Sequence, residues 1–439
     1  MGQRSEISVP TLERGNEKKL VTELGDLRQV MAIDDIRSDQ RITLVKRGEL
    51  VDSSKYDRLV GHKLLRPLDF SLAVENRITA EKLMRDGKRL LHDEPELEQA
   101  IDRRFIQRDL LTPLGTVPLE PQLAFKLTVC RECCIDRYHH MMRVALIALY
   151  VASRLRWPAD DRQELATAAL FLDLGEMHLE PSIFTSRQPL NMAQHRQIYS
   201  HPGIAYRFLK LFPNYHPRIS EAVHQHHERL DGSGYPNGLS GDSVTPAARV
   251  LGAAELLTAI RLERKNSGGR LFSTSEVLKF NTERFGKDIM VPLIEAAKRV
   301  DGAMDNASST GSINKTILQA RMKLLNDILQ GADAIDVSGD NEMARFIVQQ
   351  LKRLTGMAKR CGFDLRAPAK LLNIIGNEEK ALSELDALVR EMIYLVQSTA
   401  REALRRWVKD GVPELEQEPL TKWLRHTDLV LYSAGFLSQ

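Results

Sequence analysis

The 439-residue sequence has few cysteines, no long apolar run and no excess of charge of one sign. Its four cysteines are too few and too clustered for a disulfide framework, which favours a reducing cytoplasm. The longest apolar run, residues 144–152, falls far short of the ~20 residues that a bilayer-spanning helix needs. The first residues carry no apolar stretch typical of a signal peptide. The sequence therefore predicts a cytoplasmic protein without membrane insertion.

The charges nearly cancel, because 62 basic and 59 acidic residues leave a formal net charge of +3. This balance argues against a protein built to wrap a nucleic acid polymer. Hydrophobic residues make up 43% of the chain, which argues against wholesale disorder. At roughly 150 residues per domain, the length suggests about three domains.

Turn-forming residues divide the chain into three predicted domains. Residues 41–51 (RITLVKRGELV) read as a strand, a turn at Gly48 and a second strand, within a small N-terminal domain of residues 1–120. Residues 110–122, with three prolines, predict a linker, and residues 301–312, rich in Gly, Ser, Asn and Asp, predict a loop. Between these breaks we expect a helical domain at 123–300, followed by a C-terminal helical domain at 313–439.

The expected fold class is mostly α, with a small α+β N-terminal domain and a C-terminal helical bundle. Apolar residues recur at spacings of three and four in residues 343–357, 378–407 and 420–432, which is typical of amphipathic helices. The apolar stripe of the second segment is expected to be core or a helix-partner face; it comprises Leu382, Leu385, Leu388, Met392 and Leu395.

Histidines are concentrated in the middle of the chain: nine of the twelve lie between His139 and His227. The most specific string, residues 226–236, starts with His226 and His227 at the expected end of a helix over residues 219–227 and continues into a glycine-rich turn. Neutral imidazoles beside carboxylates suit Fe, Mn, Zn or Ni better than Mg or Ca. A metal site is therefore a candidate function of this segment.

The string HHERLDGSGYPNGLSGD at residues 226–242 resembles the signature of HD-GYP domains, which are metal-dependent phosphodiesterases that hydrolyse bacterial cyclic di-GMP. The resemblance extends to the family's upstream histidine at His140, its His-Asp pair with the following Ile-Gly-Lys at residues 172–176, and its His-Pro at His201. It also extends to the downstream Ala-Asp motif at residues 254–259, and it covers about residues 130–300. It implies a helical domain of the HD superfamily.

Four positions depart from the family pattern. Leu172 replaces the histidine of the His-Asp pair, and Glu176 replaces the lysine expected near the phosphate. Leucine cannot bind a metal, and a carboxylate at residue 176 would repel an anionic substrate. Glu255 keeps a carboxylate where the family has aspartate, whereas Thr258 does not. These departures predict that hydrolysis is lost or strongly reduced.

The resemblance and the residue types together give a set of candidate site residues. Asp173 is the candidate catalytic residue and also a candidate ligand. The complete set of candidate metal ligands is His140, Asp173, His201, His226, His227 and Glu255. The candidate substrate-binding residues are Asp231, Gly234, Tyr235 and Pro236.

Several of these residues could instead have a purely structural role. His140 lies on an apolar helix and could be a core histidine, His201 could be a turn residue, and Tyr235 could brace its loop. His178 and His195 have no family counterpart and are expected at the surface. The Cys-x-x-Cys-Cys run at residues 130–134 has no second ligand pair, so we expect small buried side chains rather than a zinc site.

Three functions compete at this stage. The first is a degenerate HD-GYP-like signalling protein that binds a divalent transition metal, a cyclic dinucleotide or a protein partner without turnover. The second is an active cyclic di-GMP phosphodiesterase with an incomplete metal cage. The third is an interaction protein in which the metal is wholly absent and the flanking domains carry the function. A homo-oligomer is compatible with each of them.

Overall fold

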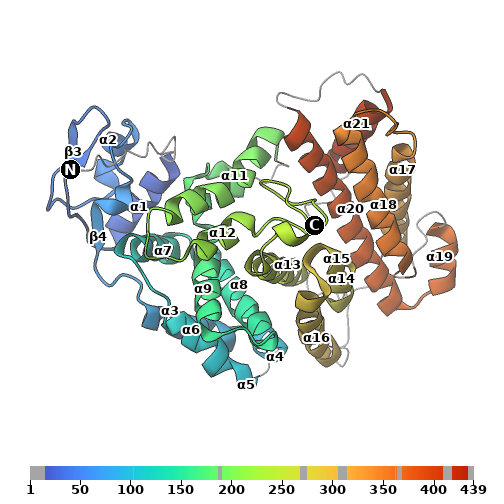
Figure 1. Ribbon diagram of the computed structural model, residues 1–439, viewed down its shortest axis with the longest axis horizontal. Coiled ribbons are helices and arrows are strands. Elements are labelled where there is room, and N and C mark those ends of the chain that lie inside the picture. The colour runs from blue at the N-terminus through green and yellow to red at the C-terminus, as the bar shows by residue number, and fades with distance from the viewer. Residues whose placement is uncertain are drawn as a thin grey trace. The chain divides into compact units, whose positions relative to one another are not determined.

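The structure is a computed structural model that describes residues 15–101, 103–185, 190–266, 274–304, 314–360, 362, 368–408 and 418–433. It is mostly helical, and its four named strands lie between Val30 and Val74 (Figure 1). The predicted mostly-α fold with a small α+β N-terminal part is thus confirmed. Within the described ranges, no helix is both long enough and apolar enough to cross a bilayer.

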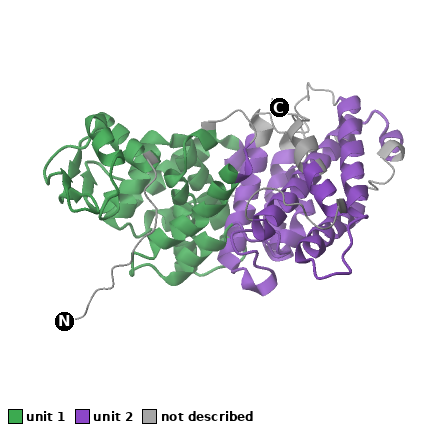
Figure 2. Cartoon of the chain, turned by 90° about the horizontal axis from the view of Figure 1, so that it is seen from above, with its two compact units in different colours: residues 1–95, 103–186, 193–226 green, residues 96–102, 187–192, 227–439 purple. Residues whose placement is uncertain are grey.

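The chain forms two compact units (Figure 2). Unit 1 comprises residues 1–95, 103–186 and 193–226, and unit 2 comprises residues 96–102, 187–192 and 227–439. The expected linker at 110–122 lies inside unit 1, and the expected break near residue 300 lies inside unit 2. Most of the loop expected at 301–312 lies outside the described residues. The division into three domains stays a prediction.

The N-terminal part of unit 1 holds two short antiparallel strand pairs. Strand β1 (Val30–Ala32) pairs with β4 (Leu72–Val74), and β2 (Ile36–Arg37) pairs with β3 (Thr43–Val45). The turn predicted at Gly48 is present, with a φ of +85° that glycine tolerates best. The prediction of a second strand after this turn is wrong, because residues 49–51 hydrogen-bond to β1 across a single bridge instead of pairing with β3.

The helices of unit 1 pack around α8 (Ile135–Arg154), which has no glycine or proline and is buried on nearly every face. It lies beside α7 (Pro121–Cys133) and α9 (Ala159–Phe171), and α9 also packs on α12 (Pro217–Gln225) (Figure 1). The remaining helical segments of unit 1 are α1 (Gly15–Leu27), η1 (Ser53–Lys55), α2 (Tyr56–Val60), η2 (Leu68–Phe70), α3 (Ala80–Asp93), α5 (Arg103–Phe105), the π-helical η3 (Ile106–Leu111), α6 (Thr112–Gly115), η4 (Leu174–His178), α10 (Ser182–Thr185) and, except for its first residue, α11 (Met192–Leu209).

Unit 2 contains a helical bundle whose core is built from α17 (Lys315–Ala332), α18 (Glu342–Arg360), α20 (Glu379–Trp407) and α21 (Glu418–Ser433). These helices include the three predicted amphipathic segments, and the predicted stripe from Leu382 to Leu395 is buried in their core. The other helical segments of unit 2 are α4 (Pro95–Ala100, except for its first residue), η5 (Gly241–Ser243), α13 (Pro246–Asn266), α14 (Thr274–Phe280), α15 (Thr282–Phe285), α16 (Lys287–Met304) and α19 (Pro368–Ile375).

A cluster of charged side chains is buried in unit 1, where Lys126 on α7 lies between two carboxylates. Its Nζ is 2.7 Å from Oδ2 of Asp69 and also contacts Glu17 on α1. The opposite oxygen of Glu17 lies 3.2 Å from Nδ1 of His178. His178 is therefore buried, and the prediction that it lies at the surface is wrong. We call these four residues the Lys126 cluster.

The cluster makes the free energy of unfolding depend on pH. Burial, followed by the charge of Glu17, raises the pKa of Asp69 to about 7, although Lys126 opposes the shift. Folded Asp69 then keeps a proton that the unfolded chain releases near pH 4. Folding therefore takes up a proton between about pH 4 and 7. The stabilisation that results from the raised pKa of Asp69 is complete below pH 4 and is lost as the pH rises towards 7.

We therefore expect stability to fall over this interval, by at most about 1.4 kcal/mol per pH unit, and to fall less in Asp69→Asn. Urea unfolding at each pH measures the slope. Asp57→Asn, on the exposed part of α2, serves as the control with an unchanged slope. An unchanged slope in Asp69→Asn would contradict the assignment.

Candidate metal centre

Asp173 is placed by the end of α9. Leu172 caps this helix and is fully buried, and Asp173 follows it at the start of η4 with 5% of its surface exposed. Gly175 brings η4 against α11, since a Cβ at this position would lie 2.1 Å from the carbonyl oxygen of His201. The glycine of the motif is therefore required for the close approach of Asp173 to His201.

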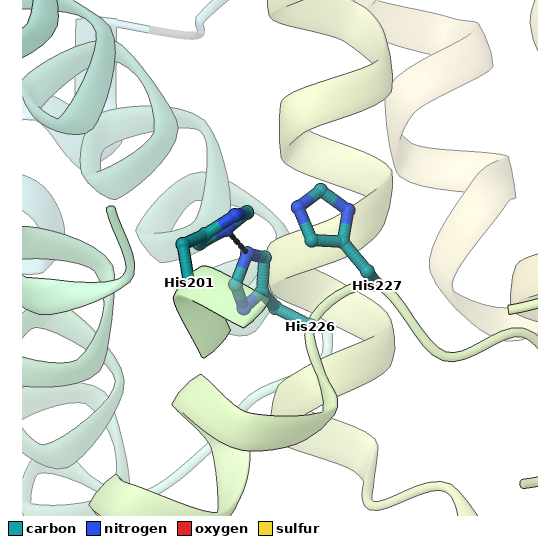
Figure 3. A group of neighbouring side chains, drawn as sticks. All are labelled: His201, His226 and His227. Carbon is teal, nitrogen blue, oxygen red and sulfur yellow. Dashed lines mark hydrogen bonds between the residues drawn. The ribbon is translucent and has the colours of Figure 1, made fainter. Parts of the chain in front are cut away.

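Three histidines of unit 1 lie close to the Asp173 carboxylate or to one another. Nε2 of His140, on α8, lies 3.5 Å from Oδ2 of Asp173, and Nε2 of His201, on α11, lies 3.5 Å from Oδ1. Nε2 of His201 is 3.3 Å from Nε2 of His226 (Figure 3). Four of the six predicted ligands thus come together inside unit 1.

The backbone fixes which ring nitrogens of this pair carry protons. Nδ1 of His201 donates to the carbonyl of Ile198 at 2.7 Å, and Nδ1 of His226 donates to the carbonyl of Val223 at 2.5 Å. A carbonyl can only accept, so both neutral rings have their proton on Nδ1. Their Nε2 lone pairs then face each other, which is unfavourable unless a cation or an extra proton lies between them.

The separation of these two nitrogens suits a shared metal ion. Two nitrogens that each lie about 2.0–2.1 Å from a tetrahedral ion are about 3.3 Å apart. The 3.3 Å between His201 and His226 matches this spacing, and Oδ1 of Asp173 lies 3.5 Å from Nε2 of His201. The residues of unit 1 therefore fit a divalent transition metal.

Glu176 belongs to the same group of possible ligands, together with Asp173 and His201. Its Oε2 accepts a hydrogen bond from Nε of Arg137 at 2.8 Å, and the Arg137 guanidinium also lies over the Phe184 ring. Burial disfavours the Arg137 cation, but Glu176, together with smaller contributions from Cys130, Cys134 and Asp173, outweighs this effect and raises the pKa of Arg137. The negative charge predicted at residue 176 is thus balanced by an arginine that sequence reasoning missed.

The remaining two predicted ligands lie in unit 2. Helix α12 ends at Gln225 rather than at His227, so His226 caps the helix and His227 begins the loop that follows. Nδ1 of His227 is 3.7 Å from Oε2 of Glu255 on α13, and its ring stacks on Tyr235 with centroids 4.4 Å apart. His226 and His227 are consecutive, so a peptide bond joins the two sets of ligands.

The glycine-rich loop that follows His227 is stabilised by a buried glutamate. Glu228 is fully buried and accepts hydrogen bonds from the backbone N–H groups of Asn237, Gly238 and Leu239 at 2.6–3.1 Å. Burial raises the pKa of Glu228, although these hydrogen bonds oppose the shift. Its carboxylate therefore organises the loop.

The four predicted substrate-binding residues all lie in this loop and make contacts within unit 2. The side chain of Asp231 accepts from Ser233, and a Cβ on Gly234 would overlap the backbone of His227 and Glu228. Tyr235 braces His227 by stacking, and the Tyr235–Pro236 peptide bond is cis. A substrate role for these residues stays a prediction.

Comparison with known proteins agrees with this geometry. Residues 119–270 match the family model described as HD domain. The chain is 32% identical over 126 residues to 3'3'-cGAMP-specific phosphodiesterase 3 of Vibrio cholerae, a match that covers 28% of this chain and 27% of that protein.

Two further relatives are named cyclic di-GMP phosphodiesterases. The response regulator RpfG of Xanthomonas campestris is 29% identical, with 27% of this chain and 32% of RpfG covered. PA4108 of Pseudomonas aeruginosa is 28% identical, with 39% of this chain and 41% of PA4108 covered. The chain thus spans about a quarter to two-fifths of the length of these relatives. Within this chain, the region around residues 119–270 is an HD-GYP-like domain of the HD superfamily.

Proposed function

We propose that this protein is a degenerate HD-GYP-like signalling protein that binds a divalent transition metal and a cyclic dinucleotide without hydrolysing the nucleotide efficiently. One observation carries the metal proposal: two Nε2 lone pairs face each other at 3.3 Å beside the Asp173 carboxylate. The proposed ligands are His140, Asp173, His201, His226, His227 and Glu255. The proposed metal is Fe, Mn, Zn or Ni, because imidazole and carboxylate ligands together suit these ions.

The residues have distinct roles in this proposal. When bound, such an ion would supply the Lewis-acid chemistry of phosphate recognition. His201 and His226 are oriented for ligation by their Nδ1–H bonds to backbone carbonyls. Asp173 contributes the negative charge that partly neutralises the ion, and a cyclic dinucleotide is proposed to approach the loop that holds Tyr235.

Loss of hydrolysis is proposed from two positions. The fully buried Leu172 occupies the place of a metal ligand in the family motif, so at least one metal site loses an imidazole. Glu176 replaces the lysine of the family motif, so no cation is available at this position for a phosphate, and its carboxylate accepts a hydrogen bond from Arg137. The protein then acts as a nucleotide- or protein-binding module, which we propose to operate in the cytoplasm.

Metal analysis and a cyclic di-GMP assay on the same sample test this proposal. We expect metal in the purified chain and saturable cyclic di-GMP binding, with hydrolysis absent or near the detection limit. Metal-dependent turnover would instead identify an active phosphodiesterase with an incomplete cage. Absence of both metal and nucleotide binding would overturn the proposal.

Leu172→His is expected to increase the metal content of the purified chain, because it adds an imidazole next to Asp173. Leu172→Gln is the matched control, since it buries a polar side chain at the same place without a good metal ligand. Equal metal content in both variants would show that the leucine at residue 172 does not account for a reduced metal content. Adding Glu176→Lys would place a second cation opposite Arg137, so that change belongs in a separate variant with Arg137→Glu.

A further inference from the structure

A positively charged groove lies on the surface of unit 2. Its lining residues follow all of the predicted metal ligands in the sequence. It is a cavity of about 570 Å³ along α18, with Glu283 and Val337 among its other lining residues. Its cationic lining residues are Arg345, Lys352, Arg353 and Arg360. We call this cavity the α18 groove. Its volume is in the range of sites that hold small organic ligands.

The spacing of residues on α18 creates the groove. Residues 345, 349, 352, 353, 356 and 360 lie on one face of the helix, whereas Ile347, Leu351 and Leu354 are buried on the opposite face. Gly356 adds no side chain, and a Cβ placed there would meet only Arg360, at 3.6 Å. Glycine is unfavourable inside a helix relative to alanine, and at this position it leaves the floor of the groove without a side chain.

The positive charge of the groove exceeds what its own neighbours balance. Among the described residues, Glu283 is the only acidic one that lines the groove. Its ion pair with Arg360 joins side chains that are more than half exposed, so this pair stabilises little. Lys352 has no ion-pair partner among the described residues. Arg345 lies in the first turn of α18, where the helix dipole disfavours a cation, and its ion pair with Asp340 at 3.6 Å is exposed to solvent. The helix dipole favours the cation of Arg360 in the last turn of α18, but it does not account for Arg345.

Arg353 connects the groove to the loop that follows His227. Its Nη1 donates to the carbonyl oxygen of Asp231 at 2.5 Å, and the neighbouring Gln350 donates to the same oxygen at 2.8 Å. From α20, Nη2 of Arg406 donates to the carbonyls of Gly232 and Gly234 at 2.7 and 3.0 Å. Helices α18 and α20 thus hold three carbonyl groups of the loop, those of residues 231, 232 and 234, through hydrogen bonds from Arg353, Gln350 and Arg406.

We propose that the α18 groove binds a phosphate-bearing anion of nucleotide size, and that Arg353 transmits its binding to the loop at residues 231–239. Guanidinium groups recognise phosphate oxygens through paired, charge-assisted hydrogen bonds, and Lys352 adds a further cation. An anion that draws on the free donors of Arg353 would fix this side chain and, with it, the Asp231 carbonyl. This site is independent of the proposed metal centre.

Calorimetry on the full chain with 5′-GMP, and with guanosine as the ligand without phosphate, tests the proposal. We expect GMP to bind and guanosine not to bind. Lys352→Glu should weaken GMP binding at least about 10-fold, since a lost charged hydrogen bond is worth about 1.5–3 kcal/mol. Lys359→Glu is the matched control, because it makes the same charge change at an exposed position of α18 outside the groove.

Two further measurements locate the site and its effect. Gly356→Leu should abolish GMP binding by filling the groove while favouring the helix, and GMP should slow hydrogen exchange in residues 231–239 of the unmodified chain. His226→Ala should leave GMP binding unchanged. The proposal is overturned if GMP does not bind, if Lys359→Glu weakens binding as much as Lys352→Glu, if His226→Ala abolishes binding, or if the loop exchanges at the same rate.

Discussion

Lys126→Met is expected to lower the free energy of unfolding by about 3–5 kcal/mol, because it leaves two buried carboxyl groups without the cation that they share. Lys126 and Asp69 are each about 1% exposed, and Glu17 is nearly as deeply buried. Burial opposes the charge of Glu17, but His178 and Lys126 hold its pKa well below the usual range. Without Lys126, the buried charge of Glu17 loses one of the two side chains that stabilise it.

Urea unfolding measures this loss, and two variants control for it. Lys19→Met removes a lysine whose pair with Glu23 is exposed to solvent, so it should change stability by less than about 0.5 kcal/mol. The triple variant Lys126→Met, Glu17→Gln and Asp69→Asn also removes the two carboxyl groups that Lys126 contacts and should recover part of the loss. If Lys126→Met were as stable as Lys19→Met, the cluster would not contribute to folding.

His226→Ala is expected to reduce metal affinity by more than about 100-fold. Changes to groups that merely orient a ligand typically cost 10–100-fold, and His226 is proposed to be a ligand itself. The variant also removes one of the two facing Nε2 atoms, so His201 alone remains at that position. Titration of the metal-free chain with Zn²⁺ in the presence of a competing chelator measures the change.

His224→Ala is the matched control for this variant. His224 lies in the last turn of α12, two residues before His226, and its ring stacks on Tyr206 with centroids 4.6 Å apart. It should therefore leave Zn²⁺ affinity within about twofold. Equal losses in both variants, or no loss in His226→Ala, would contradict the assignment of His226 as a ligand.

Local patterns in the sequence predicted the helices and much of the site. The apolar spacing on α20 correctly predicted its buried face, and the motif spacing brought His140, Asp173, His201 and His226 into one cluster. These features follow from helical periodicity and from the order of a known motif. Neither source of information requires knowledge of a long-range contact.

Interactions between distant segments were not predictable in this way. His178 looked like a surface residue because its partner Glu17 is near the other end of unit 1 in the sequence. The Arg137–Glu176 pair links a helix to a segment beyond the following helix, so no spacing rule predicts it. Similarly, residues 49–51 pair with β1 because the backbone of that strand is available, which the residue types alone do not reveal.

The Lys126 cluster also limits how this HD domain can be separated or exchanged. Lys126 lies within the region that matches the family model, residues 119–270, whereas Glu17 and Asp69 lie outside it. A fragment cut at residue 119 would keep the buried ammonium group and lose both of its carboxylate partners. The segment containing Glu17 and Asp69 therefore belongs to the cooperative folding unit of this domain, and grafting the domain between relatives would require both parts to move together.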